Sequence, residues 1–200
     1  MKRGIYRKLK NRAIIHTPDI QQSKNDSGID AYSSTLLAIV ANLKNSGKPK
    51  DFNCTSSVGS SKRETVFLRL FGRADYEREI FEVVSFQAHG CLAMIAAGSA
   101  ICEMLHGKTW KEALKIQPED ILVALDGVPW KKKHTIYFAV EATRALVGDC
   151  LFRAGQKRDT IERFVGCDDQ MMDCRLCEHC SLRSTRNALH LKEMEYAERG

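Results

Sequence analysis

Residues 86–114 read FQAHGCLAMIAAGSAICEMLHGKTWKEAL, and this stretch decides the fold. It begins as an alternating, β-like run and changes after His89 to apolar residues at helical spacing. Alanine and serine are frequent in the predicted helix, and small side chains let a helix approach a sheet closely. Gly107 provides a stop signal. We therefore predict a strand that leads directly into a buried helix, with Cys91 at the junction.

Two β-like runs precede this junction. Residues 64–72 (ETVFLRLFG) and 78–88 (REIFEVVSFQA) alternate in side-chain character and are rich in aromatic and β-branched residues. The residues between them are few enough for a hairpin, so we predict an antiparallel pair. Upstream, residues 32–43 carry apolar side chains at helical spacing, which predicts a helix. Residues 45–62 are rich in Gly, Ser, Pro and Asn, and we expect a connector there.

Helices follow the junction. Residues 109–116 and 117–125 each open with a capping signal: Thr109 pairs with Glu112 in the first, and a proline stands near the start of the second. After a turn at GVPW, apolar residues from Ile136 onward define a long amphipathic helix. Strands first and helices afterwards predict an α+β fold, in which a small antiparallel sheet packs against helices.

The chain divides into three predicted parts. Residues 1–55 form an N-terminal extension whose first 30 residues are polar and read as loop, followed by one helix. Residues 56–153 form the central α+β domain. Residues 154–200 form a Cys-rich extension with a short helix near 157–165 and an exposed helix at 186–199.

The bulk composition narrows the class of protein. Apolar residues make up 44% of the chain, enough for a core, and the net charge of +6 is dispersed rather than interleaved with aromatic residues. We therefore expect no nucleic-acid partner. The sequence has no secretory signal and no run of about 18 apolar residues, so we expect a cytoplasmic protein without a membrane partner. In a reducing compartment, eight cysteines indicate metal ligation or redox chemistry rather than a disulfide framework.

Cys91 is the first candidate site residue. The dipole and the free N–H groups at a helix N-terminus stabilise a thiolate, so Cys91 is a candidate sulfur nucleophile or metal ligand. The alternative is a small buried core residue. With His134 as general base, Cys91 would suit a thiol-dependent transferase. No further acid–base constellation accompanies this pair, so we expect a protein that is not an enzyme.

The central domain resembles the U-type iron–sulfur cluster assembly scaffolds, known as the NifU/IscU family. The similarity lies in the order and spacing of HGC, the small-residue helix, GKTWKEAL, IQPEDILVAL and VPWKKKHTIYFAVEATRAL, over residues 62–151. It implies the NifU/IscU-like fold and a role in building or carrying iron–sulfur clusters. It also implies partners: a cysteine desulfurase or other assembly proteins, and apo-proteins that accept clusters.

The resemblance implies a set of site residues as well. Family scaffolds use three cysteines, an aspartate and sometimes a histidine. The second cysteine matches Cys91, and the histidine matches His134. Thr135 replaces the third cysteine, Lys62 replaces the first, and Glu64 stands where the aspartate would be. Cys91, His134 and Glu64 are therefore scaffold-site candidates, and this set suits an open Zn²⁺ site better than a [2Fe–2S] cluster.

A second candidate site lies near the C-terminus. Four cysteines follow the pattern Cys-x6-Cys-x2-Cys-x2-Cys; they are Cys167, Cys174, Cys177 and Cys180. Successive Cys-x-x-Cys turns bring sulfurs together, and the triplet is similar to a ferredoxin run that a more distant cysteine completes. We predict a [4Fe–4S] cluster on these thiolates. A four-cysteine zinc site and a redox or persulfide-carrying thiol cluster remain alternatives. Flanking arginines, among them Arg186, are placed to offset the thiolate charge.

Two classes of function fit these sites. The first is an iron–sulfur scaffold-like or carrier protein that binds iron and a cluster at the C-terminal cysteines, with Cys91 as a sulfur acceptor. The second is a metal- or redox-sensing interaction protein that keeps the fold for protein contacts and uses a structural zinc or iron–sulfur centre as its signal.

Overall fold

The computed structural model describes residues 20–22, 28–59, 66–167 and 180–198. Its centre is a four-stranded sheet in the order β1-β4-β3-β2. The strands are β1 (Ile20–Gln22), β2 (Cys54–Gly59), β3 (Phe67–Asp75) and β4 (Ile80–Gly90). β2, β3 and β4 pair antiparallel, and β1 adds to β4 in parallel. The predicted α+β class is confirmed.

The predicted hairpin is also confirmed. β3 and β4 pair from Phe67 opposite His89 to Asp75 opposite Ile80, with an irregularity between Arg73 and Ala74. The turn occupies residues 76–79. Because of this register, His89 lies at the end of the sheet from which the chain enters the next helix.

Two predicted connectors contain strands instead. β2 lies inside residues 45–62, and β1 lies inside the polar N-terminal segment. β2 is a short run of small and polar residues, CTSSVG, with little strand propensity of its own. It is stabilised by pairing with β3 and by contacts with the helices, including a hydrogen bond from Ser56 Oγ to the carbonyl of Ala142 at 2.7 Å. Local sequence therefore could not identify it.

The helices lie where the sequence predicts them. They are α1 (Ser34–Ala41), α2 (Leu92–Leu105), α3 (Trp110–Ala113), α4 (Pro118–Ala124) and α5 (His134–Arg153), with short 3₁₀ turns η1 (Ile29–Ala31) and η2 (Trp130–Lys132). Thr109 and Glu112 form the predicted capping box of α3. A proline opens α4, as expected.

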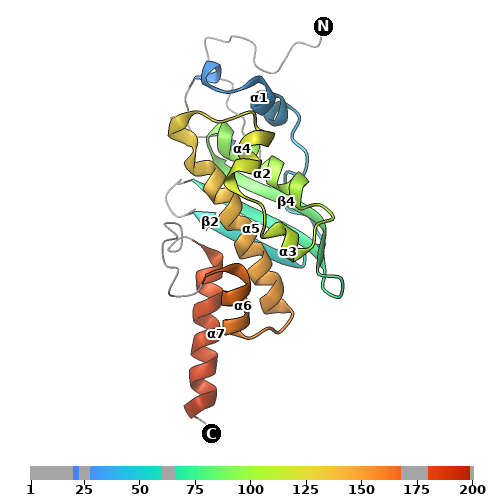
Figure 1. Ribbon diagram of the computed structural model, residues 1–200, viewed down its shortest axis with the longest axis vertical. Coiled ribbons are helices and arrows are strands. Elements are labelled where there is room, and N and C mark those ends of the chain that lie inside the picture. The colour runs from blue at the N-terminus through green and yellow to red at the C-terminus, as the bar shows by residue number, and fades with distance from the viewer. Residues whose placement is uncertain (1–19, 23–27, 60–65, 168–179, 199–200) are drawn as a thin grey trace.

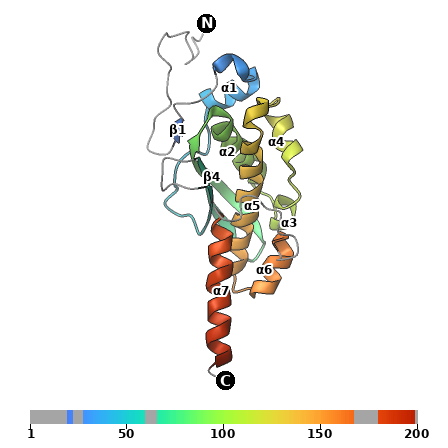
Figure 2. The same cartoon turned by 90° about the vertical axis from the view of Figure 1, so that its left-hand side faces the viewer.

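The core lies between the sheet and the pair α2 and α5, which cover one of its faces (Figures 1 and 2). Gly98 of α2 lies against Phe86 and Leu68, where an added Cβ would come within 2.6 Å of the Phe86 ring and 3.0 Å of Leu68. α1 joins the same core through Leu36 and other buried side chains. The small residues noted in the sequence therefore serve close packing of helix on sheet.

The C-terminal helices α6 (Arg158–Val165) and α7 (Ser181–Glu198) follow. α7 begins five residues before the predicted start, directly after Cys180. In both views it runs beside α6 and continues away from the sheet (Figures 1 and 2). Among the described residues, no helix combines the length and apolar character needed to cross a bilayer.

Candidate thiol sites

Cys91 lies at the junction of β4 and α2, as predicted, and it is the N-cap residue of α2. Its carbonyl accepts the N–H groups of Met94 and Ile95 at 3.0 and 3.2 Å, which starts the helix. The residue is only 5% exposed and belongs to the main apolar core. This burial agrees with the core-residue alternative and leaves a thiolate there little access to water.

His134 opens α5, and its ring meets that of Phe138 edge to face at 6.3 Å. Burial, together with the neighbouring Lys132 ammonium, lowers the pKa of His134. Thr135 is fully buried, and its hydroxyl donates to the carbonyl of Lys132 at 2.8 Å. Thr135 therefore stabilises the start of the helix and faces the interior.

These residues do not assemble into a metal site within the part of the chain that the structure describes. There, no three His, Cys, Asp or Glu side chains gather closely enough to hold a metal ion. Lys62 and Glu64 lie outside the described residues. His89, next to the junction, instead meets the ring of Phe67 edge to face at 6.0 Å.

Cys54 is the cysteine nearest upstream of Lys62, and it lies in a different region. It starts β2 opposite Gly72, whose β4 neighbour is Val84, roughly 20 Å along the sheet from the Cys91 end. Its thiol donates to the Gly72 carbonyl at 3.4 Å. A hydrogen bond with Cys54, together with burial, raises the pKa of Cys150. Cys150 is therefore held in the thiol form.

The C-terminal motif begins where α6 ends. Gly166 caps α6 in the left-handed conformation, with φ of 68°. The N–H of Cys167 then donates to the carbonyl of Glu162 at 3.0 Å. This arrangement ends the helix and fixes the backbone at Cys167, whose side chain is half-buried against the core. Cys174 and Cys177 lie outside the described residues.

Cys180, the next described residue, lies at the outer edge of β2. It forms an antiparallel bridge with Val58, and the N–H of Ser57 donates to Ser181 Oγ at 2.9 Å. Another outward N–H of β2, that of Thr55, donates to a carboxylate oxygen of Asp149 at 2.8 Å. Side chains of α5 and α7 therefore satisfy the edge of β2, and the first turn of α7 is docked on the sheet.

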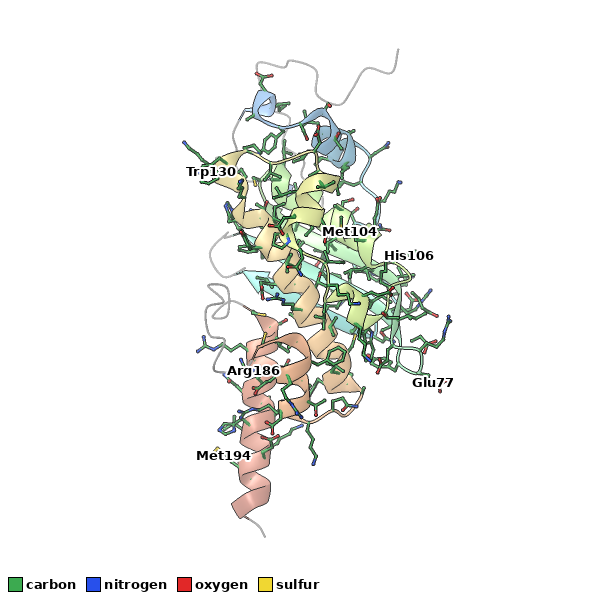
Figure 3. All side chains as sticks on the ribbon, viewed as in Figure 1. Glu77, Met104, His106, Trp130, Arg186 and Met194 are labelled. Atoms are coloured by element: carbon green, nitrogen blue, oxygen red, sulfur yellow. The ribbon has the colours of Figure 1, made fainter. Side chains whose placement is uncertain are left out.

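A buried ion-pair cluster joins α6 to α7. The Glu162 carboxylate accepts from Arg158 Nε at 3.1 Å and from Arg186 Nε at 2.7 Å. Figure 3 shows Arg186 where α7 runs beside α6. The spacing of Arg158 and Glu162 is a recognisable helical pair, but Arg186 is 24 residues from Glu162, and no pattern in the sequence links them. Glu162 thus pairs with the Arg186 charge that the sequence analysis assigned to the thiolates, and that assignment stays a prediction.

Comparison with known proteins identifies the family to which the chain belongs. The family profile described as "NifU-like N terminal domain" matches residues 31–157. The chain belongs to this family. It is 33% identical over 134 residues to the iron–sulfur cluster assembly scaffold protein IscU 1 of Archaeoglobus fulgidus, covering 66% of this chain and 83% of the relative.

Other members of the NifU-like family show similar identity. The IscU scaffold of Aquifex aeolicus is 28% identical over 125 residues, covering 62% of this chain and 79% of the relative. The nitrogen fixation protein NifU of Trichormus azollae is 34% identical over 122 residues, covering 58% and 40%. A solved putative SUF-system scaffold from Fervidobacterium islandicum superposes with a TM-score of 0.47 at 14% identity, covering 60% of this chain and 99% of that one.

The matched family range ends before the C-terminal motif. It stops at residue 157, and α6 begins at Arg158. All four C-terminal cysteines, α6 and α7 therefore lie beyond the part of the chain that the NifU-like profile covers. The sequence comparison is consistent with a family domain to which a docked, thiol-bearing extension is attached.

Proposed function

We propose that this NifU-like protein is an iron–sulfur cluster scaffold or carrier, and that its cargo cluster is bound by Cys167, Cys174, Cys177 and Cys180. Scaffold relatives at about one third identity support the role in cluster assembly. Four closely spaced thiolates are the donor set that iron–sulfur clusters prefer. A [4Fe–4S] cluster is the proposed form, and iron is the proposed metal.

One observation carries the choice of the C-terminal motif over the family's own position. Thr135 has no thiol, and its buried hydroxyl is bonded to the Lys132 carbonyl, so this position, which the resemblance assigns to a cysteine, offers no ligand to a metal. Cys167 and Cys180, by contrast, stand at the two helix ends that flank the motif, and both are half-buried rather than sealed in the core. Cys91 is proposed as a sulfur acceptor, and His134 and Glu64 are proposed as residues of the same scaffold site.

The proposed partners and compartment follow from the scaffold or carrier role. A cysteine desulfurase or other assembly protein supplies sulfur, apo-proteins receive the cluster, and the chain itself catalyses no reaction. The cytoplasm is the proposed compartment, because exposed thiols stay reduced there.

Anaerobic purification tests the proposal directly. The protein is expected to be brown, with visible sulfide-to-iron charge-transfer absorption and matching iron and acid-labile sulfide contents. Cys174→Ser should abolish this absorption, and Cys91→Ser should leave it in place. A colourless protein with one tightly bound zinc ion would remove the iron–sulfur proposal.

A sensing role is the alternative, and two exposed apolar side chains offer contacts to a partner protein. Trp130 is 78% exposed on η2 (Figure 3). The ammonium of Lys133 lies 4.4 Å from the centre of its ring. Val123 of α4 is also exposed. Such residues suit a protein contact. A cluster or zinc ion that does not transfer to an apo-ferredoxin, but whose loss changes binding to a partner, would support sensing over delivery.

A further inference from the structure

Glu162 contacts both ends of the segment that carries the C-terminal motif. Through its main chain, it accepts the N–H of Cys167 at 3.0 Å. Through its carboxylate, it accepts from Arg186 at 2.7 Å, six residues beyond Cys180. A single residue therefore links the position where the motif begins to the helix on which it ends.

This link is buried. The side chains of Glu162 and Arg186 are only 9% and 11% exposed, and that of Arg158 is 21% exposed. Arg158 also reaches the third turn of α7, where its Nη1 lies 2.7 Å from His190 Nδ1. Charged groups buried to this degree require their partners in place, because an unpaired buried charge is strongly unfavourable. The cluster thus sets one relative placement of α6 and α7.

The start of α7 is fixed independently of this cluster. Ser181 and Cys180 meet the edge of β2, and Leu182 packs into the space left by Gly148 of α5. Beyond its first turn, α7 also packs against α5 and partly buries Leu189 against the core. The Glu162 cluster adds the ionic contact that fixes α7 against α6.

We propose that Glu162 is a positioning residue for the C-terminal thiol site: it holds α6 against α7 so that Cys167 and Cys180 are presented at a fixed separation for a thiolate-binding metal. This inference rests on the proposed function, because it presupposes that the four cysteines bind one centre. Glu162 itself is not a ligand in this proposal.

Removing the Glu162 carboxylate has two physical effects that change the metal affinity in opposite directions, which makes the proposal testable. Glu162→Gln raises the local charge by one unit, and electrostatics alone would then strengthen binding of a thiolate-rich site. The same change leaves two guanidinium groups facing each other and loosens the helix pair, which weakens a site that depends on their placement. Weaker binding is therefore the specific signature of positioning.

The test is anaerobic titration of the reduced, full-length chain with Co²⁺, followed by thiolate-to-cobalt charge-transfer absorption and competition with a chelator. Glu162→Gln is expected to weaken Co²⁺ binding by roughly 10-fold, the lower end of the range for lost supporting contacts of metal ligands, because the carboxylate acts on Cys167 and Cys180 only through the helix pair. Glu141→Gln is the matched control, because it removes a carboxylate that pairs with Arg144 within α5 alone. The control should bind Co²⁺ like the original chain.

A second pair of variants protects the test against misfolding. Arg186→Met breaks the same contact from α7 and should weaken binding similarly. The exchange Glu162→Arg with Arg186→Glu should restore most of the affinity, which general destabilisation would not. Equal or tighter Co²⁺ binding by Glu162→Gln overturns the positioning role alone. Absence of thiolate–cobalt absorption in the unmodified chain would instead reject the proposed thiol site, and the positioning role with it.

Discussion

Cys91 and Cys180 both stand immediately before a helix, yet their surroundings are opposite. Cys91 precedes α2, a helix whose residues are nearly all buried, and the cysteine belongs to the core. Cys180 precedes α7, whose first turn is attached to the edge of β2 through a backbone bridge and a serine hydroxyl. The same helix-dipole argument applies to both thiols. Packing around the helix start, more than the dipole, therefore decides which thiol is accessible for chemistry.

The two regions also differ in what holds them. The β4–α2 junction depends on apolar close packing, with Gly98 against Phe86. The α6–α7 pair depends largely on polar contacts, with Glu162 between two arginines. We therefore expect the family domain to keep its fold when the extension is loosened, and the extension to lose its placement when the domain is disrupted.

The largest effect is expected when one helical glycine in each region is replaced by valine. Gly98→Val forces a Cβ into the Phe86 ring and should destabilise the domain by about 3 kcal/mol, because the overpacked core must shift. Gly148→Val meets only the end of the Leu182 side chain and should displace α7 instead. Denaturant unfolding measures the first effect. Faster amide exchange in α7, with α2 still protected, reports the second.

The next largest effect is expected at the apolar side chain that packs α7 against α5. Leu182 is 3% exposed and packs against α5, so Leu182→Ala should cost about 2 kcal/mol in the free energy of unfolding. Leu191, on the same helix but 61% exposed, is the control, and Leu191→Ala should change stability by less than about 0.5 kcal/mol. Equal effects of the two variants would contradict the docked placement of α7.

A smaller effect is expected at Thr135, where the family resemblance led us to expect a replaced cysteine. Thr135→Val removes the hydrogen bond to Lys132 and should destabilise by about 1 kcal/mol. Thr135→Cys should leave a thiol that reacts slowly with iodoacetamide in the folded protein, because the position is fully buried. Rapid alkylation, or a new Co²⁺ site that requires Cys91, would show that the family site is still competent.

The smallest expected effect is a pH dependence from His134. Because burial and Lys132 lower its pKa in the folded protein, the unfolded chain binds more protons between that lowered pKa and the usual value near 6.5. Stability should therefore fall as pH drops through this window and level off below it. His134→Gln should flatten the dependence, as measured by denaturant midpoints across pH. The exposed His106 provides the control, His106→Gln, which should leave the slope unchanged.

Several elements were predictable because their signals are local. The β3–β4 hairpin follows from alternation and a short turn, and the start of α3 follows from Thr109 and Glu112 three residues apart. β1 and β2 were not predictable, because neither has a periodic apolar pattern and each is stabilised by a neighbouring strand. Cys91 was placed correctly at a helix start, but its burial depends on the helices packed around it.

Local sequence was enough to predict the β3–β4 hairpin, the helices that follow it and the two sets of thiols, because periodicity, caps and spacing act over a few residues. Only the tertiary structure decided that Thr135 faces inward, that Cys180 meets Val58, and that Glu162 joins Arg186 across 24 residues. The physical reason is range: burial and ion pairing between distant segments depend on how whole elements pack, and no local pattern encodes that packing.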